Sequence, residues 1–536
     1  MKRLWTNIMI FFGCFLLLVT TIGAVLIIAP GMELLGIMYI RSTSGTVSVS
    51  ESVSDAINYE TITIESDNIP VVIEFVQSYS LTVDFVDKYD GFAKAGDSPS
   101  IDIKSTGTGL VVQSFEYKPF LGFSRDAESG LFVKIPMYYT NDIVVNSNKS
   151  KVKFSGQKAT VRDVTVNANG EITLANDMAL HALTLNMGNK NAIVADNVNI
   201  TGKVIANSKR GNLTLPAGFG GAVEFTSTTG DLLCAGCAQL TFKSDTGNIK
   251  GTANSNPIIT GDANINTGGS ITIESIGGAG IIYSKHGKVT LGKENTTYTN
   301  RFKINTKSGK LTMYGKYTNH ENSITTKYGD IKIDFLENAN ITLNRGDATI
   351  INFDNGKIVS TSGDITIWNI QNSVIETKSG DVEIGVDGKI AGGATITTKS
   401  GDVEIKNAGE TKFTIVTETG DVSFAQNVEN ISELNIQSTK GDVELIDVSG
   451  KTTVTTNGKI FASIYNLNSM VELTGKNKKV EVTVRNKCYV DLSSKKKIET
   501  APNMEERVKA FKNVPEGEER YLKISTNKGK IAVYVV

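Results

Sequence analysis

The octapeptide TKSGDVEI occurs twice in this chain, at Thr377–Ile384 and again at Thr398–Ile405. Related copies lie on both sides of this stretch. Their glycines form a series with gaps of 17 to 22 residues: Gly287, Gly309, Gly329, Gly346, Gly363, Gly380, Gly401, Gly420 and Gly441. A repeat of about 20 residues is typical of stacked-coil proteins, in which each coil contacts only its neighbours. The repeat therefore constrains the fold more strongly than any single residue does.

Apolar residues stand at fixed distances from each glycine. Five residues before it, all nine copies have isoleucine: Ile282, Ile304, Ile324, Ile341, Ile358, Ile375, Ile396, Ile415 and Ile436. Apolar residues also stand two and four after it, as in Val403 and Ile405. Apolar residues two apart indicate a strand, and a glycine among small polar residues indicates a sharp corner. One unit is therefore a strand, a corner and a second strand, followed by a looser return.

The position three before the glycine is mostly a hydroxyl residue. The series reads Ser284, Thr306, Thr326, Leu343, Ser360, Thr377, Thr398, Thr417 and Ser438. Alternation with the isoleucines places this position on the inner face as well. A buried hydroxyl needs a hydrogen-bond partner, which a neighbouring coil or the corner backbone would offer.

A single coil cannot fold alone. Ordering about 20 residues costs roughly 20–40 kcal/mol, whereas three large apolar side chains return only about 1.5–3 kcal/mol each. Stacked coils pair every strand above and below and share one core. We therefore predict an all-β fold, a parallel β-helix-like β-solenoid rod of roughly 15 coils and about 70–80 Å. A propeller is the alternative, but its blades repeat at about 40–45 residues.

The charge balance is close to neutral. The 536 residues include 55 Lys and Arg against 56 Asp and Glu, a net charge of −1, and four cysteines. The overall composition therefore gives no basic excess of the kind that nucleic-acid binding needs, and we predict no nucleic-acid partner. Four cysteines are too few for a disulfide-dense scaffold.

The N-terminus has the pattern of a membrane anchor. Lys2 and Arg3 precede 22 uncharged residues, Ile8 to Ala29, which is long enough to span about 30 Å of hydrocarbon. We predict a cytoplasmic segment at 1–7, a transmembrane signal-anchor helix at 8–29, and the rest of the chain outside a single-pass cell membrane, by the positive-inside rule. A cleaved signal peptide is the alternative.

The remaining segments complete the predicted organisation. Residues 41–150 alternate without the repeat and are expected to form an irregular β cap region, or a separate small sandwich. Residues 151–490 hold the solenoid repeats, with degenerate coils up to about 280. Residues 491–536 form a C-terminal cap with one short helix at Asn503–Phe511 and closing strands at Tyr521–Ile524 and Lys530–Val535.

No residue pattern indicates a reaction. Aspartates follow seven of the corner glycines: Asp330, Asp347, Asp364, Asp381, Asp402, Asp421 and Asp442. They could bind calcium, but we expect each to accept hydrogen bonds from its own turn, because the calcium repeat G-G-x-G-x-D is missing. We expect Cys234 and Cys237 to be core residues or a local disulfide rather than a zinc or redox site. We therefore predict no catalytic residues, no cofactor-binding residues and no metal ligands.

The LFVKIP junction at Leu131–Pro136 and the following SGDVEI-type units resemble the "putative adhesin" family of bacterial surface proteins, a domain of unknown function with repeated SGDV-type coils. The resemblance covers roughly residues 45 to 490. It implies a β-solenoid, an extracytoplasmic location and no known catalytic residues. This chain is unusually long for the family, and its early coils are degenerate.

Three functions remain open. The first is a non-enzymatic structural or adhesive role at the cell surface, with a surface glycan, wall polymer or protein as ligand. The second is an envelope-stress or signalling accessory. The third is a polysaccharide-active β-helix enzyme, which would need a converging carboxylate pair or a basic residue beside bound calcium. Asp and Lys instead recur evenly, as a scaffold produces, so we expect no enzyme and no cofactor.

Overall fold

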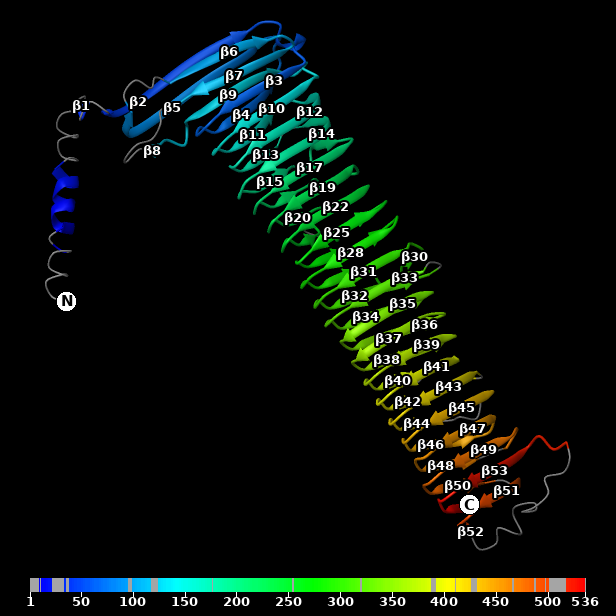
Figure 1. The fold of residues 1–536 in the computed structure, drawn as a ribbon. Coiled ribbons are helices and arrows are strands. Elements are labelled where there is room, and N and C mark those ends of the chain that lie inside the picture. Colours follow the sequence, from blue (N-terminus) through cyan, green and yellow to red (C-terminus); the bar gives the residue numbers. More distant parts are fainter. Residues whose placement is uncertain are drawn as a thin grey trace. The chain divides into compact units, whose positions relative to one another are not determined.

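The computed structural model describes residues 9, 11–21, 33–34, 38–94, 99–116, 124–175, 177–252, 255–318, 321–386, 392–409, 411–425, 431–464, 467–485, 488–496, 498–500 and 517–535. It separates the chain into two compact units. Unit 1 comprises Met1–Gly247 and Thr252–Ser255, and unit 2 comprises Asn248–Gly251 and Asn256–Val536. Each unit is built from short β-strands and is described by itself (Figure 1).

Unit 1 holds two sheets. One contains β1 (Glu33–Leu34), β2 (Met38–Val53), β5 (Leu81–Lys94), β8 (Ser124–Arg125), β9 (Gly130–Pro136), β4 (Val71–Val76), β11 (Val152–Gly156), β13 (Ile172–Leu174), β15 (Ala192–Val194), β18 (Leu213–Thr214) and β20 (Leu232–Leu233). The other contains β6 (Ser100–Thr106), β7 (Gly109–Phe115), β3 (Thr61–Ser66), β10 (Asp142–Ser147), β12 (Ala159–Ala168), β14 (Met178–Met187), β16 (Val198–Ile200), β17 (Lys203–Ser208), β19 (Ala222–Ser227) and β22 (Gln239–Ser244). Two short elements, η1 (Ala56–Asn58) and β21 (Gly236–Cys237), lie outside them.

Antiparallel strands of unit 1 pass directly into parallel coils. Strand β5 runs antiparallel to β2 and β9, whereas β9 pairs in parallel with β4, and β4 with β11. In the other sheet, β7 is antiparallel to β6 but parallel to β3. The edges of the first coil, β3 and β4, are therefore already paired. This is how a β protein protects strand edges that would otherwise template aggregation.

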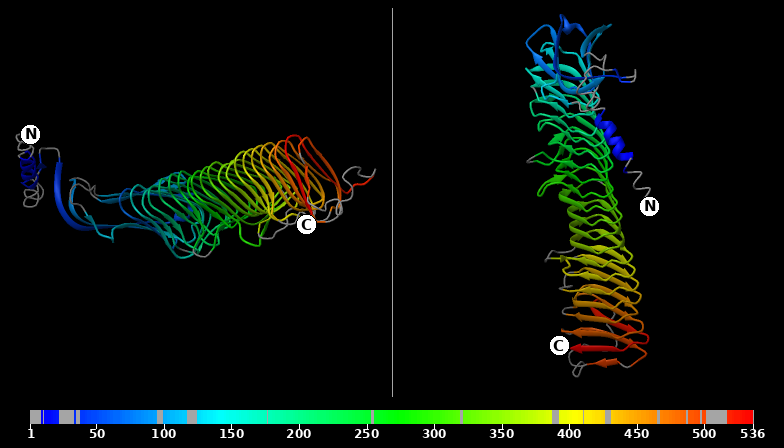
Figure 2. Two further views of the ribbon diagram at one scale, coloured as in Figure 1. Left: turned by 90° about the horizontal axis from the view of Figure 1, so that it is seen from below. Right: turned by 90° about the vertical axis from the view of Figure 1, so that its left-hand side faces the viewer.

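Unit 2 is a stack of parallel coils (Figures 1 and 2). One sheet contains β25 (Ala263–Thr267), β28 (Gly280–Ser284), β31 (Phe302–Thr306), β33 (Asn322–Thr326), β35 (Ala339–Arg345), β37 (Lys357–Ser362), β39 (Ser373–Thr377), β41 (Ala394–Thr398), β43 (Lys412–Thr417), β45 (Glu433–Ser438), β47 (Lys451–Thr456), β49 (Val471–Gly475), β53 (Tyr521–Thr526) and β51 (Tyr489–Ser494).

The second sheet of unit 2 contains β23 (Ile249–Lys250), β26 (Ile271–Ile273), β29 (Val289–Leu291), β32 (Leu311–Tyr317), β34 (Ile331–Glu337), β36 (Ala348–Asp354), β38 (Ile365–Gln371), β40 (Val382–Ile384), β42 (Val403–Ile405), β44 (Val422–Phe424), β46 (Val443–Val448), β48 (Ile460–Ile464), β50 (Val480–Val484), β54 (Ile531–Val535) and β52 (Ile498–Thr500). Short strands β24 (Ile258–Ile259), β27 (Ser275–Ile276) and β30 (Thr297–Tyr298) lie in the longer returns. The predicted all-β solenoid is confirmed.

The isoleucine column forms the core of unit 2 as predicted. All nine isoleucines are at most 1% exposed. Ile375 lies opposite Ile396, and Ile396 opposite Ile415, in consecutive parallel registers. Like side chains therefore stack from coil to coil, and one continuous apolar core runs through the unit.

The hydroxyl column also faces inward, with every member buried. Several members bond the corner that follows them. The Thr326 hydroxyl donates to the Gly329 carbonyl at 2.9 Å, and the Ser438 hydroxyl to the Gly441 carbonyl at 3.2 Å. Two members do not follow this rule, because the hydroxyls of Thr306 and Ser360 have no hydrogen-bond partner among the described residues.

The return after the second strand is tighter than predicted in the shortest coils. Asn338, Asn355 and Asn372 stand 17 residues apart with φ of 53°, 49° and 46°, in the left-handed region that asparagine tolerates. Each forms a second sharp corner between two strands of five to seven residues, for example β34 and β35. The expected looser return is therefore wrong for these coils, and extra residues in the longer coils fall at this second corner.

The last two coils are out of sequence order. Strand β53 pairs with both β49 and β51, and β54 pairs with both β50 and β52. The predicted closing strands thus exist, but they lie between two earlier coils (Figure 1). The predicted helix at 503–511 lies outside the described residues.

The N-terminal segment is described only in part. Residues 11–21 are helical. Among the residues that the structure describes, none of the helices combines the length and the apolar character that a membrane crossing requires.

Candidate binding groove

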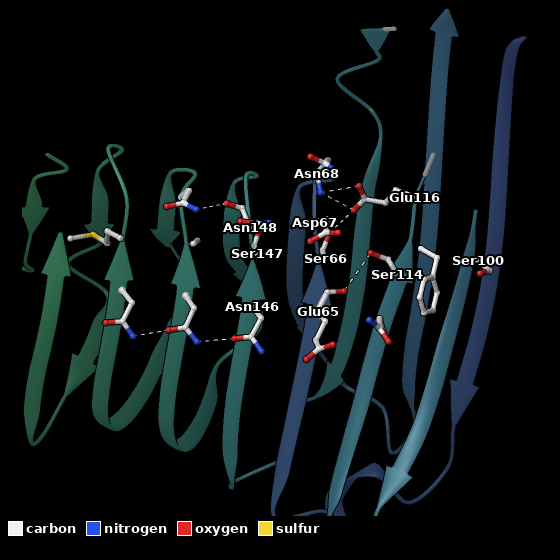
Figure 3. A pocket seen from close by; sticks show the side chains of 17 residues that line it. Glu65, Ser66, Asp67, Asn68, Ser100, Ser114, Glu116, Asn146, Ser147 and Asn148 are labelled. Atoms are coloured by element: carbon white, nitrogen blue, oxygen red, sulfur yellow. Dashed lines mark hydrogen bonds between the residues drawn. The ribbon is translucent and has the colours of Figure 1, made fainter. Parts of the chain in front are cut away.

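A groove of about 930 Å³ lies in unit 1 over the outer face of the sheet that contains β7, β3, β10, β12 and β14 (Figure 3). Most of its lining is amide, hydroxyl or carboxylate: Glu65, Ser66, Asp67, Asn68, Ser100, Gln113, Ser114, Glu116, Asn146, Ser147, Asn148, Asn167, Asn169 and Asn186, with Phe115, Ala168 and Met187. Hydrogen-bonding groups therefore dominate this surface.

Four asparagines form a side-chain ladder, and the first three of them line the groove. Asn146, Asn167, Asn186 and Asn207 occupy one register position on β10, β12, β14 and β17. The amide nitrogen of each later asparagine donates to the amide oxygen of the one before it, at 2.7, 2.7 and 2.9 Å. Figure 3 shows the first two of these bonds. A primary amide has two N–H donors and two acceptor lone pairs. An internal member of the ladder therefore keeps one donor and one acceptor site for another molecule.

A second polar row lies beside this ladder. Asp67, Asn148 and Asn169 follow the ends of β3, β10 and β12, and the Asn169 amide donates to the Asn148 carbonyl at 2.6 Å. Phe115, whose side chain is 43% exposed, adds an aromatic ring at the end of β7. Paired amides beside an exposed ring suit a ligand that has both hydroxyl groups and apolar C–H faces.

A buried carboxylate holds one wall of the groove. Glu116, with a side chain only 3% exposed, accepts N–H groups of Asn68 and Ile69 at 2.8–3.0 Å and the Ser66 hydroxyl at 2.9 Å (Figure 3). The Arg125 guanidinium lies 3.6 Å away and also bonds the fully buried Asp87 at 2.9 Å. Since Glu116 is committed to these bonds, it braces the 66–69 corner and is poorly placed to act as an acid or base.

The repeat pattern of the sequence did not predict this groove. The four asparagines do recur at 19 or 21 residues, each one residue before the end of its strand, and this spacing was the available signal. Glu116 gave no signal, because its partners lie nearly 50 residues earlier in the chain.

The corner aspartates of unit 2 form a ladder of a different kind from the one predicted. Each of the first six carboxylates accepts the backbone N–H of the corresponding aspartate in the next coil, at 2.7–3.1 Å, and the last, Asp442, accepts the N–H of Lys459 at 2.7 Å. The expectation of bonds within the same turn is therefore wrong. The carboxylates join consecutive coils, because the corners stack directly over one another. Among the described residues, no group of His, Cys, Asp and Glu is arranged to hold a metal ion.

The cysteines are free thiols. Cys234 and Cys237 are both buried, and burial raises the pKa of each thiol to about 12. They pack as small apolar residues, as predicted, and the local disulfide left open above is not formed. Cys488 is buried too, and its pKa is raised to about 11 by the same cause.

Two of the histidines lie among the described residues, one in each unit. His181 lies 3.3 Å from Asp163 in unit 1, and His286 lies 3.0 Å from the Ser308 hydroxyl in unit 2. His320 lies outside the described residues.

Comparison with known proteins identifies a domain family for this chain. The Toastrack DUF4097 family model matches residues 235–424 and again residues 374–533. No curated protein matches the chain. Among solved structures, the chain is similar to a "putative cell adhesion protein" from Clostridium sporogenes, with 10% identity, a TM-score of 0.22, and coverage of 43% of this chain and 100% of the other. That score says nothing about function.

The family match begins and ends later than the predicted span of 45–490. Its two segments together run from residue 235 to 533, more than half of the 536 residues. The predicted membership of an adhesin-like domain family of unknown function is confirmed, and the chain belongs to the Toastrack DUF4097 family.

Proposed function

We propose that this protein is a membrane-anchored, extracytoplasmic and non-enzymatic binding protein of the cell surface, whose unit 1 groove binds a hydroxyl-rich glycan. The amide ladder carries the proposal. It offers a free donor and acceptor at each coil, spaced about 4.8 Å apart, which suits a chain of hydroxyl-bearing rings. The 22-residue uncharged run after Lys2 and Arg3 supports the anchor and its orientation.

A non-enzymatic role fits the chemistry of the groove. Glycosidic hydrolysis needs one carboxylic acid free to protonate the leaving group and a second carboxylate across the bond. Glu116 is held by three backbone contacts and a hydroxyl, so it is not free for that task. Most of the remaining lining groups are amides and hydroxyls, which bind hydroxyls without activating them. Glu65 and Asp67 are the other two carboxylates of the lining.

The ladder supplies a matched pair of variants for testing glycan binding. Asn167 lines the groove, whereas Asn207 belongs to the same ladder but lies outside the lining. On a glycan array, the full chain in detergent is expected to bind a defined set of oligosaccharides. N167A should lose about tenfold in affinity through two lost hydrogen bonds, and N207A should stay within about twofold.

Equal losses for N167A and N207A would contradict binding in the groove. Release of unsaturated or reducing sugars by the full chain would contradict a non-enzymatic role. Protection of a C-terminal tag from protease added to intact cells would contradict the extracytoplasmic placement.

A further inference from the structure

The corner edge of unit 2 carries lysines before its run of aspartates begins, and lysine returns at this position after the run, at Lys459 and Lys479. From Asp330 to Asp442, the position after each corner glycine is aspartate, and every carboxylate bonds the next coil. In the two preceding coils the same position is Lys288 and Lys310. Lysine has no acceptor, so the backbone N–H groups of Lys310 and Asp330 find no side-chain acceptor there among the described residues. These two coils therefore lack the hydrogen bond between a side-chain carboxylate and the backbone N–H of the next coil, which the later coils form.

The same coils bring further cations to this edge. Lys285, Lys307 and Lys327 stand two residues before their glycines. The backbone N–H of Lys307 donates to the Ser284 carbonyl at 2.9 Å, and that of Lys327 donates to the Thr306 carbonyl at 3.0 Å. These corners therefore stack in register. Five ammonium groups therefore lie in two columns across three coils, with neighbours in a column about 4.8 Å apart at their backbones.

These five lysines are exposed and uncompensated. None of them forms an ion pair with a described residue. Lysines at the same ladder position farther along are different, because Lys459 lies 4.0 Å from Asp442 and Lys479 lies 2.8 Å from Glu481. The one nearby carboxylate in the two columns is Asp330, in the third coil.

An exposed aromatic residue borders the cluster. The Tyr328 ring is 45% exposed and lies 5.1 Å from the Lys327 ammonium and 5.9 Å from the Arg345 guanidinium. Arg345 adds a sixth cation in the next coil. A surface that stacks like charges and forgoes a structural hydrogen bond departs from the local pattern of the fold, and such departures are typical of functional sites.

We infer that Lys285, Lys288, Lys307, Lys310 and Lys327 form a binding edge for a flexible polymer that carries phosphate charges. Ammonium groups bind phosphate as point charges, and two columns of them along stacked corners follow a linear chain rather than a single small anion. The edge shares no residue with the unit 1 groove, and the inference does not rest on the glycan proposal.

The test uses the full chain and long-chain inorganic polyphosphate, with binding measured at several salt concentrations. K288D/K310D continues the aspartate ladder, so its melting temperature should be equal to or above that of the wild type. Its polyphosphate affinity should fall at least tenfold. K288Q/K310Q should lower the slope of log affinity against log salt by about two, since each lost phosphate contact removes about one.

K459Q/K479Q is the matched control, because those lysines hold the same ladder position but have acidic partners. It should change the affinity less than twofold. The inference is overturned if the control loses as much as K288Q/K310Q, if wild-type chain does not bind polyphosphate, or if poly-glutamate, duplex DNA or anionic lipid vesicles bind as tightly as polyphosphate.

Discussion

At the scale of single residues, a few buried polar groups fix the local geometry of the groove. Glu116 is the clearest case, since one carboxylate satisfies two backbone N–H groups and a hydroxyl at the 66–69 corner. Replacing the Glu116 carboxylate by an amide keeps the shape of the side chain but removes the charge that strengthens these hydrogen bonds. The new NH₂ group is a donor and would face the backbone N–H groups, which are also donors.

E116Q should therefore lower the free energy of unfolding of the full chain by roughly 2–3 kcal/mol. E128Q is the control, because Glu128 is 69% exposed and its pairing with Lys88 is a surface ion pair. That variant should cost less than about 0.5 kcal/mol. Denaturant titration of the three proteins measures both changes, and equal stability of E116Q and wild type would remove the bracing role of Glu116.

The buried thiols give a prediction for alkaline pH. The folded state raises the pKa of Cys234 and Cys237 from the ordinary 9.0 to about 12. Above pH 9 the unfolded state loses these protons while the folded state keeps them, so the contribution to stability is full below pH 9 and is lost between pH 9 and 12.

Native protein at pH 8 should accordingly leave Cys234 and Cys237 unmodified by iodoacetamide, and denatured protein should react at both. Peptide mass spectrometry distinguishes the sites, and the denatured sample serves as the control for full reactivity of both thiols. Fast native alkylation of Cys234 would show that the segment directly after β20 opens readily.

At the scale of elements, the unit of construction is one coil. The three shortest coils repeat at 17 residues, and strands β34, β36 and β38 pair in an unbroken register, Ile331 with Ala348 and Ala348 with Ile365. Removal of one whole coil should leave the neighbouring coils able to pair. Removal of 16 residues instead of 17 would shift the register by one residue, and the inward and outward faces of the following strand would be exchanged.

Deletion of residues 348–364 should therefore give a folded protein with nearly the wild-type melting temperature, as read by circular dichroism. Deletion of residues 348–363, which is one residue shorter, is the matched control and should be strongly destabilised. If both deletions melt alike, the register between coils does not specify the fold.

At the scale of the whole molecule, the C-terminal segment closes the fold out of sequence order. The coil of β53 and β54 separates the coil of β49 and β50 from that of β51 and β52. Within the described part of the chain, β53 is the strand neighbour of β51, and β54 that of β52. Stability of residues 489–500 thus depends on residues that follow them.

A chain that ends at residue 516 should lose amide-exchange protection at 489–500 while β47 and β48 keep theirs. The full chain is the control. Continued protection of 489–500 would mean that β51 pairs directly with β49, which the matching registers Val471–Leu522 and Val490–Leu522 would allow.

The local pattern by itself determined the solenoid of this protein: the alternation, the corner glycines, the isoleucine core and the inward hydroxyls. Each of these depends on residues within one coil, so a repeat displays them directly. It did not determine the second corners at Asn338, Asn355 and Asn372, because only Asn355 is followed by a glycine and no glycine recurs at this position from coil to coil. Only the tertiary structure decided the aspartate bonds between coils, the Glu116 brace, the groove and the insertion of β53, because these depend on which distant segments become neighbours, and a period in the sequence does not specify partners.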